Sequence, residues 1–285
     1  MSQKSIIEFV KERLEQGGLE LPVFNAVAVK VQQMLSLGDC SAKAIAEAIQ
    51  RDQALVSHVL RVANAPFYAG LNPVKTIQDA IVRLGDRSIA NMVMMVTQKR
   101  SYFSRNTKLQ RLMPPLWSHA LGVAVGSRWM ARHLGLDGLA EEAFMAGLLH
   151  DIGKLLLLKI VEDLQQPESI EVNVSGSVIR DILETMHTAQ GEILMRYLNM
   201  PESYCQVVAK HHDAELSDES VLVNLIRLVN LTCHKLGIGL KSDPGLMLST
   251  TPEAINVMAA DLVLAELQVK LGEYKDSVNS FLAVH

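Results

Sequence analysis

The sequence predicts an all-α fold, and three observations lead to it. Aromatic residues make up only 5% of the chain, whereas aliphatic residues that favour helices are abundant. Apolar residues recur at three- and four-residue spacing along most of the chain, as they do on one face of a helix. No segment shows the sustained apolar and polar alternation that is typical of a strand. We therefore predict a multi-helix bundle with an N-terminal helical subdomain.

The first hundred residues are expected to form short helices joined by tight connections. In chain order, the expected helices cover residues 6–14, residues 27–35, three segments with Ser41, Asp52 and Thr76 as N-caps, and a segment through Met95. Gly85 suits a helix C-cap, and Asn64 opens a loop rich in Asn, Pro and Gly. We assign Asp52, Asn64 and Gly85 to capping and turns, with no catalytic role.

A polar segment over residues 101–115, which ends in a Pro pair, predicts a joint between subdomains. Longer helices are expected beyond it, over residues 116–134, 139–158, 178–198, 202–211 and 220–236, and one or two more in the last fifty residues. The predicted organisation is an N-terminal helix at 1–20, an N-terminal helical part at 21–108, a second helical subdomain at 109–236 and a C-terminal extension at 237–285.

The composition limits the expected cellular location and the classes of binding partner. The net charge of -4 and the absence of a Lys or Arg run argue against an extended nucleic-acid footprint. Three scattered cysteines, Cys40, Cys205 and Cys233, suit small buried residues in a reducing compartment. No signal-peptide pattern and no run of about 18 apolar residues is present. We expect a cytoplasmic protein with no membrane partner, and the sequence does not indicate its oligomeric state.

His150 and Asp151 are embedded in an apolar run over residues 144–158. A carboxylate buried without a partner costs several kcal/mol, and a metal ion or a cluster of donors offsets that cost. On one helix the two side chains would differ by about 100° in direction, yet both could reach one divalent ion. The alternative is an ordinary His–Asp hydrogen bond in the core, and this segment alone leaves both interpretations open.

Further histidines favour the metal site. They lie on or beside other predicted helices, at His119, His187 and the pair His211–His212. Gly191 follows His187 at helical spacing, which would allow close packing over the imidazole. Each histidine alone is more often a surface or capped core residue. Together with Asp151 they have the residue types of a site for Fe, Mn, Zn or Ni.

The order of these motifs carries a family resemblance. His119, the HDIGK segment from His150 to Lys154, His187 with Gly191, and His211–His212 resemble the HD superfamily of metal-dependent phosphohydrolases. Three N-terminal segments make the family assignment more specific. They are LPVFNAVAVKV at 21–31, IQRDQALVSHVLRVANAPFY at 49–68 and TIQDAIVRLGDRSIANMV at 76–93. They resemble the HDOD domain, a regulatory relative of the HD-GYP cyclic-di-GMP phosphodiesterases, and imply an HD-superfamily-like bundle.

The resemblance implies roles for individual residues. By it, the metal ligands are His119, His150, Asp151, His187, His211 and His212, and Lys154 contacts phosphate. The family's glutamate one turn before His119 is replaced by Pro115, and its late aspartate by Asn230. Asn binds a cation less strongly than a carboxylate, and Pro does not bind one through its side chain. Cleavage by two metal ions is therefore not favoured.

Two functions follow from the resemblance. The preferred one is an HDOD-type bacterial signal-transduction regulator with a metal-capable centre, little catalysis, and a signalling protein or a nucleotide as partner. The alternative is a metal-dependent phosphohydrolase acting on a phosphodiester or nucleotide such as cyclic-di-GMP, with Asp151 and Lys154 as catalytic residues. The histidines outside the motif are assigned structural or surface roles, namely His58, His133, His234 and His285. A helical nucleic-acid-binding protein is a weaker third possibility.

Overall fold

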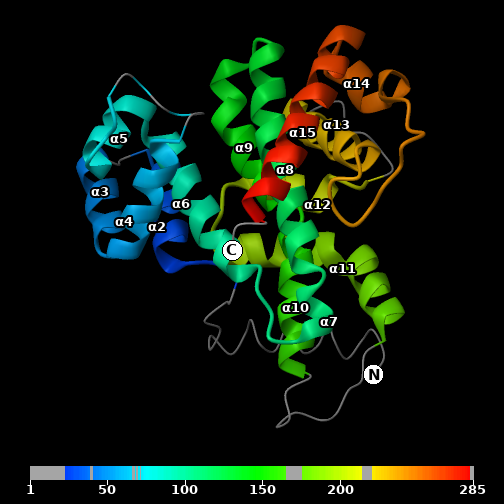
Figure 1. The fold of residues 1–285 in the computed structure, drawn as a ribbon, viewed down its shortest axis with the longest axis horizontal. Helices are drawn as coiled ribbons and strands as arrows, with labels where there is room; N and C mark the ends of the chain where they lie inside the picture. The colour runs from blue at the N-terminus through cyan, green and yellow to red at the C-terminus, as the bar shows by residue number, and fades with distance from the viewer. Residues whose placement is uncertain are drawn as a thin grey trace. The chain divides into compact units, whose positions relative to one another are not determined.

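The computed structural model describes residues 23–38, 41–65, 68, 70, 72–164, 175–213 and 220–282. Every regular element within these ranges is a helix, which confirms the all-α prediction (Figure 1). The expected helix at 6–14, Cys40 and His285 lie outside the described residues. Contacts group the chain into two compact units, one of residues 23–101 with 198–201, the other of residues 102–197 with 202–285.

The described residues of the smaller unit form five helices. They are α2 (Ala26–Ser36), α3 (Ala42–Gln50), α4 (Gln53–Ala63), α5 (Ile77–Leu84) and α6 (Asp86–Ser101). The predicted N-caps are confirmed, because Ser41, Asp52 and Thr76 each accept a hydrogen bond from a backbone N–H in the first turn of the helix that follows. Gly85 ends α5 with a φ of 84°, a conformation that favours glycine.

The loop between α4 and α5 is held by side chains at both of its ends. Asn64, where α4 ends, bonds to both the N–H and the carbonyl of Val74, each at 2.9 Å. Arg83 on α5 donates to the carbonyls of Ala63 and Asn72. Asn64 therefore does more than end a helix: together with Arg83 it fixes the loop against its own unit.

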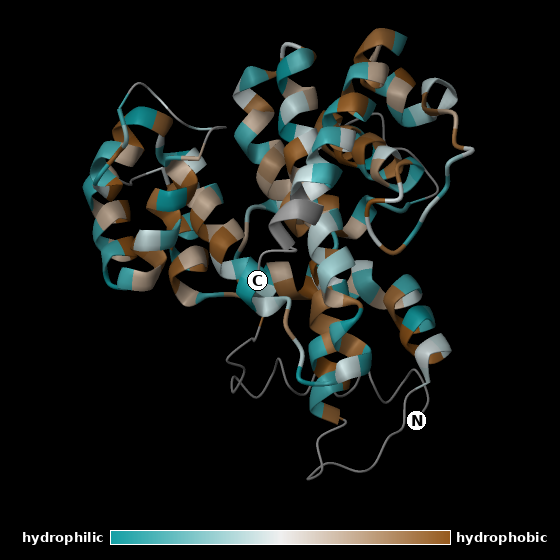
Figure 2. Cartoon of the chain, in the orientation of Figure 1, coloured by the Kyte–Doolittle hydropathy of each residue, from teal (hydrophilic) through white to brown (hydrophobic). Residues whose placement is uncertain are grey.

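The larger unit holds the remaining helices. They are α7 (Thr107–Gln110), α8 (Met113–His133), η1 (Asp137–Leu139), α9 (Ala140–Leu149), α10 (Ile152–Leu164), α11 (Gly176–Tyr197), α12 (Glu202–Lys210), α13 (Val221–Lys235), η2 (Leu248–Thr250), α14 (Pro252–Asn256) and α15 (Asp261–Leu282). Hydrophobic and hydrophilic residues are mixed along them (Figure 2). No helix in the described ranges is long and apolar enough to span a membrane.

Close helix packing in this unit depends on glycines of α8. A Cβ at Gly126 would lie 2.6 Å from Cγ1 of Val229, and one at Gly122 would lie 3.1 Å from the ring of Tyr274. These positions let α13 and α15 approach α8 closely. Tyr274 also donates a hydrogen bond to the carbonyl of Ser118 at 3.0 Å, so the C-terminal helix is attached to α8.

The predicted continuous helix over residues 139–158 is wrong. The structure interrupts it, ending α9 at Leu149 and beginning α10 at Ile152, so His150 and Asp151 lie at a junction between two helices. The apolar run contains no Pro to signal a break. The signal lies in a distant part of the sequence. Directly after the break, the α10 backbone at Gly153 packs on the carbonyl of His187 in α11.

Candidate metal centre

The six predicted ligand residues converge inside the larger unit. His119 lies on α8, His150 and Asp151 at the α9–α10 junction, His187 on α11, and the pair His211–His212 directly after α12. All are buried to 4% exposure or less except His212, which is exposed. The structure therefore brings the residues together, while their role as ligands remains a prediction.

Asp151 stands between two groups of histidines. Its Oδ2 lies 3.7 Å from Nε2 of His119 and 3.5 Å from Nε2 of His150. Its Oδ1 lies 3.4 Å from Nε2 of His187 and 3.3 Å from Nε2 of His211. His212 belongs to this second group, whose ligand atoms all lie within 4.8 Å of one another. Each carboxylate oxygen thus faces its own set of imidazoles, so Asp151 and the two sets of histidines would be the residues to hold one or two ions.

Backbone carbonyls orient the imidazoles. Nδ1 of His119 lies 2.9 Å from the carbonyl of Ile238, and Nδ1 of His150 lies 2.8 Å from that of Gly147. A carbonyl only accepts, so each Nδ1 donates and each Nε2 of a neutral ring carries a lone pair. The two Nε2 atoms are 3.3 Å apart. Two lone pairs at that separation repel each other unless a cation or a proton lies between them, so the pair fits a bound cation.

The surroundings favour neutral imidazoles at His119, His150 and His187 and an ionised carboxylate at Asp151. Burial lowers the pKa of His119, lowers that of His150 further, and lowers that of His187 to about 4. Burial alone would raise the pKa of Asp151, but Lys154, His150 and His211 hold it well below its usual range. Neutral imidazole nitrogens around an ionised carboxylate form a donor set suited to Zn, Mn, Fe or Ni. The residues therefore fit the expected metal.

Lys154 supplies the positive charge beside Asp151. Its Nζ lies 2.6 Å from Oδ2 of Asp151, and the lysine is only 9% exposed. A buried carboxylate is stable only when it is paired. The ammonium therefore neutralises Asp151 on the same side as His119 and His150.

Two glycines allow the helices of the centre to approach. A side chain at Gly153 would overlap the carbonyl of His187, and one at Gly191 would lie 2.6 Å from Cγ1 of Val208. Gly191 had been expected to pack over the imidazole of His187. Instead it packs against Val208 and the backbone of Gly153, so its role is to let α11 contact α10 and α12.

Sequence reasoning missed the part of the centre supplied by residues 234–241. Ile238 holds His119, and Gly239, with a φ of 120°, packs on the same ring, where an added Cβ would lie 3.0 Å from the Cβ of His119. His234 stacks on His119 with ring centroids 5.3 Å apart and planes 5° apart. It had been assigned a structural or surface role, although its position one turn after Asn230 was an available signal.

The two positions that break the family pattern are also located. Pro115 lies in the first turn of α8 and offers no side-chain donor. Asn230 on α13 is 3% exposed, and its Oδ1 has no hydrogen-bond partner among the described residues. An unpaired buried carbonyl oxygen is costly. Asn230 is thus an unused acceptor in the helix that also carries His234.

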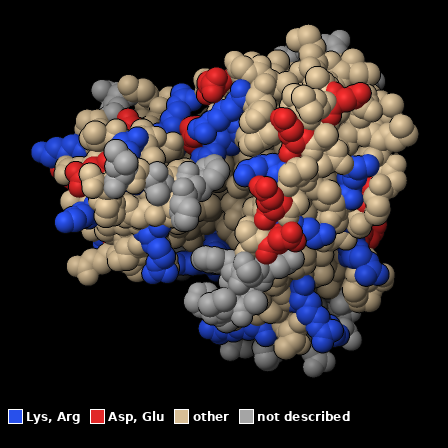
Figure 3. Space-filling model, turned by 45° about the horizontal axis from the view of Figure 1, so that its top comes forward, with Lys and Arg blue, Asp and Glu red and all other residues tan. Residues whose placement is uncertain are grey.

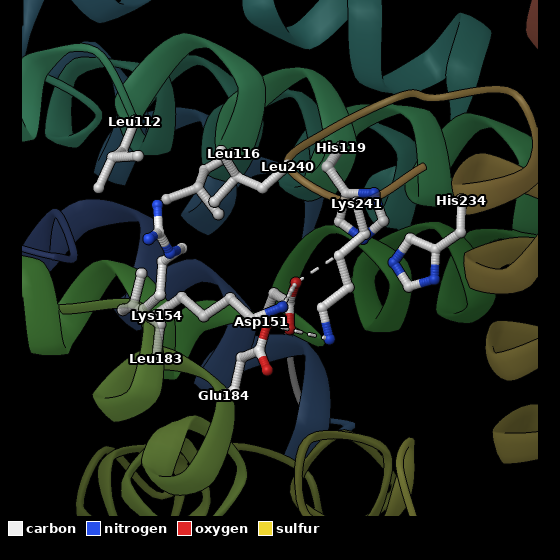
Figure 4. A pocket seen from close by; sticks show the side chains of 11 residues that line it. Leu112, Leu116, His119, Asp151, Lys154, Leu183, Glu184, His234, Leu240 and Lys241 are labelled. Carbon is white, nitrogen blue, oxygen red and sulfur yellow. Dashed lines mark hydrogen bonds and ion pairs between the residues drawn. The ribbon is translucent and has the colours of Figure 1, made fainter. Parts of the chain in front are cut away.

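A pocket of about 230 Å³ opens beside Oδ2 of Asp151. Figure 4 shows Leu112, Leu116 and Leu183 on the left and His119 and His234 on the right. The lining residues are Leu112, Leu116, His119, Asp151, Lys154, Arg180, Leu183, Glu184, His234, Leu240 and Lys241. The lining includes His119 and Lys154, which contact Oδ2 of Asp151, and includes neither His187 nor His211, which contact Oδ1. The pocket therefore opens on the Oδ2 side of the carboxylate.

These features define a helical protein with a buried His/Asp centre of the HD type. The family model described as the HDOD domain matches residues 21–214, more than half of the chain. The chain belongs to the HDOD domain family, as the order of its motifs had predicted.

Solved structures share the fold. An HDOD domain protein of unknown function from Geobacter sulfurreducens is 21% identical, with a TM-score of 0.72 and 98% of both chains covered. A protein from Shewanella amazonensis SB2B, provisionally described as a metal-dependent phosphohydrolase, is 22% identical, with a TM-score of 0.68 and coverages of 95% and 98%. One from Marinobacter aquaeolei VT8, provisionally described as a signal transduction protein, is 19% identical, with a TM-score of 0.66 and coverages of 98% and 64%.

A curated relative shows that the match can be part of a longer protein. An uncharacterised protein of Treponema pallidum (strain Nichols) is 22% identical over an alignment of 227 residues that covers 76% of this chain. It covers only 43% of that protein, so the chain spans less than half of its length. At these identities the likenesses establish the fold.

Proposed function

We propose that this chain is a cytoplasmic signal-transduction module whose His/Asp centre binds one or two divalent ions and which hydrolyses phosphodiesters little or not at all. The observation that carries the proposal is the position of Asp151, with one oxygen toward each group of histidines. A signalling protein or a nucleotide is the proposed partner. The mixed charge on the face in Figure 3, where acidic and basic side chains are scattered, favours neither over the other.

The case for weak catalysis rests on the ligand positions that differ from the family pattern. Two positions where the resemblance places carboxylates carry Pro115 and Asn230. Carboxylates add negative charge that holds divalent ions and helps to orient a reactive water. Among the described residues Asp151 is the one carboxylate in the ligand groups, so the centre retains imidazole donors and has less charge to hold a second ion.

Metal analysis and a hydrolysis assay test this proposal together. Protein purified without chelators should contain about one to two equivalents of Fe, Mn, Zn or Ni by elemental analysis. Cyclic-di-GMP and bis(p-nitrophenyl) phosphate should be hydrolysed no faster by this protein than by Asp151→Ala. Metal content below about a tenth of an equivalent, with no rebinding on titration, would contradict metal binding. Turnover abolished by Asp151→Ala would contradict the regulatory role.

One observation favours the alternative, a metal-dependent phosphohydrolase. The pocket gives a substrate access to Oδ2 of Asp151, with Lys154 beside it. A bound divalent ion would lower the pKa of a water and polarise a phosphate oxygen. In this version Lys154 would bind the phosphate, so Lys154→Met should abolish turnover without lowering the metal content. Turnover that survives Lys154→Met would count against this assignment.

A further inference from the structure

We propose that the pocket beside Oδ2 of Asp151 binds an organic phosphate or phosphonate with an apolar or aromatic group, and that Arg180 and Lys241 hold its anionic end. This inference deepens the proposed function and rests on it, because it names the class of ligand that the centre senses. It concerns residues outside the His/Asp motif.

Cationic groups line the pocket in excess of acidic ones. Lys154, Arg180 and Lys241 face it, whereas its carboxylates are Asp151 and Glu184. Each carboxylate already lies near a lysine, Asp151 at 2.6 Å from Lys154 and Glu184 at 3.6 Å from Lys241.

Of the three cationic side chains that line the pocket, Arg180 is the one that does not lie near a carboxylate of the lining. It is exposed on α11, and no ion pair or hydrogen bond involves its side chain within the described ranges. A guanidinium binds phosphate through two parallel hydrogen bonds. An anion at the pocket is therefore the natural partner for the charge of Arg180.

The rest of the pocket wall is apolar. A ligand with an apolar group therefore fits the pocket better than an inorganic anion does. Four leucines line it, at positions 112, 116, 183 and 240, and they come from α8, its preceding residue, α11 and the loop after α13. An apolar group that covers them removes leucine surface from water, which favours binding. The volume of about 230 Å³ is below the lower end, ~300 Å³, of the range for small-molecule sites, so the pocket admits a small ligand or one end of a larger one.

Substitution of Glu184 should change the ligand affinity in the opposite direction from substitution of the cations. It lies one turn after Arg180 on α11 and reaches Lys241, with about half of each of the two side chains exposed. A phosphate held by Lys241 would compete with Glu184 and be repelled by it. Neutralising Glu184 should therefore strengthen binding, whereas neutralising either cation should weaken it.

The experiment is calorimetric titration of the full chain with phenylphosphonate, which carries an aromatic group and is not hydrolysed. Inorganic phosphate tests the contribution of the anionic group alone, and benzyl alcohol tests that of the aromatic group alone. We expect phenylphosphonate to bind at least about tenfold more tightly than either. Arg180→Gln and Lys241→Gln should each weaken it about tenfold, the low end for a charge-assisted hydrogen bond. Glu184→Gln should strengthen it about threefold.

Lys270→Gln is the matched control, because Lys270 forms a comparable exposed pair with Glu273 at 3.2 Å on α15 and does not line the pocket. It should leave binding unchanged. The inference is overturned if phenylphosphonate does not bind, if it binds no better than inorganic phosphate, or if Lys270→Gln weakens it as much as Arg180→Gln.

Metal content measured on the same samples separates the two proposals. Arg180→Gln and Lys241→Gln should retain the metal of the unmodified protein, because neither residue belongs to the ligand groups. Metal-loaded protein that does not bind phenylphosphonate overturns this inference alone. Binding of phenylphosphonate by protein that takes up no metal overturns the proposed centre and leaves the pocket standing.

Discussion

The two sides of Asp151 contain the same ligand type in different surroundings. Oδ1 faces His187 and His211, with His212 close by, and no ammonium of a described residue contacts it. Oδ2 faces His119 and His150, but it also pairs with Lys154 and borders the pocket. An ion on the Oδ2 side must compete with an ammonium that is already in place. The comparison therefore predicts that the first ion binds on the Oδ1 side, while the Oδ2 side exchanges cations and contacts ligands.

Asp151→Ala should have the largest effect, because it removes the group shared by both sides. We expect the metal content to fall to near zero. We also expect the metal-free protein to lose about 3–5 kcal/mol of unfolding free energy, since Lys154 would be buried without a partner. Urea unfolding in chelator measures this loss, and Asp151→Ala/Lys154→Met should recover part of it. A loss below about 1 kcal/mol would show that the pair is not buried as described.

Single histidine substitutions should separate the two sides. His211→Ala should weaken the first ion by more than the ~10–100-fold that removal of an outer-shell partner costs. His119→Ala should leave that ion in place and remove only the weaker one. Titration with Mn²⁺ or Zn²⁺, followed by calorimetry, gives the two affinities. Equal effects of the two substitutions on the first ion would mean that the sides do not differ.

Gly153→Ala should disturb the Oδ1 side through packing. An added methyl group would overlap the carbonyl of His187 and push α10 away from α11. We expect a loss of about 1–3 kcal/mol of unfolding free energy and weaker binding of the first ion. Gly272→Ala on α15 is the control, because no atom lies within 4 Å of its added Cβ. That variant should be as stable as the unmodified protein or slightly more so.

Lys154→Met should have the smallest effect on metal affinity, and that effect should have the opposite sign. Without the ammonium at Oδ2 of Asp151, the second ion should bind about tenfold more tightly, a change of about 1.4 kcal/mol. The affinity of the first ion should change less. The same metal titration measures both affinities, and weaker binding of the second ion would contradict competition by the ammonium.

The sequence predicted the helices better than it predicted the centre's geometry. Caps such as Ser41 and Asp52 were confirmed because a cap is a local hydrogen bond within one turn. The helix break at His150 was not predicted. It occurs where α10 packs on α11, and the apolar sequence around His150 does not reveal contacts with a distant helix. Cys205 and Cys233 are buried, as their scattered positions had predicted.

The identity of the convergent residues could be predicted, but their supporting shell could not. The His and Asp residues stand out because such groups are rare inside apolar helices. Arg180 and Lys241 did not stand out, because an isolated charge on a helix or loop is usually a solvated residue. His234 and Ile238 needed the fold itself, since only the path of the loop after α13 brings them to His119.

The hydrogen bond from His119 to the carbonyl of Ile238 joins residues 119 positions apart, and that from Tyr274 to Ser118 joins residues 156 positions apart. Closing such long loops costs entropy before any contact is gained. During synthesis the ribosome must release residue 238 before His119 can be fixed in its final orientation. The Oδ2 side of the centre should therefore acquire its affinity for an ion late, after the helices that precede residue 238 have been synthesised.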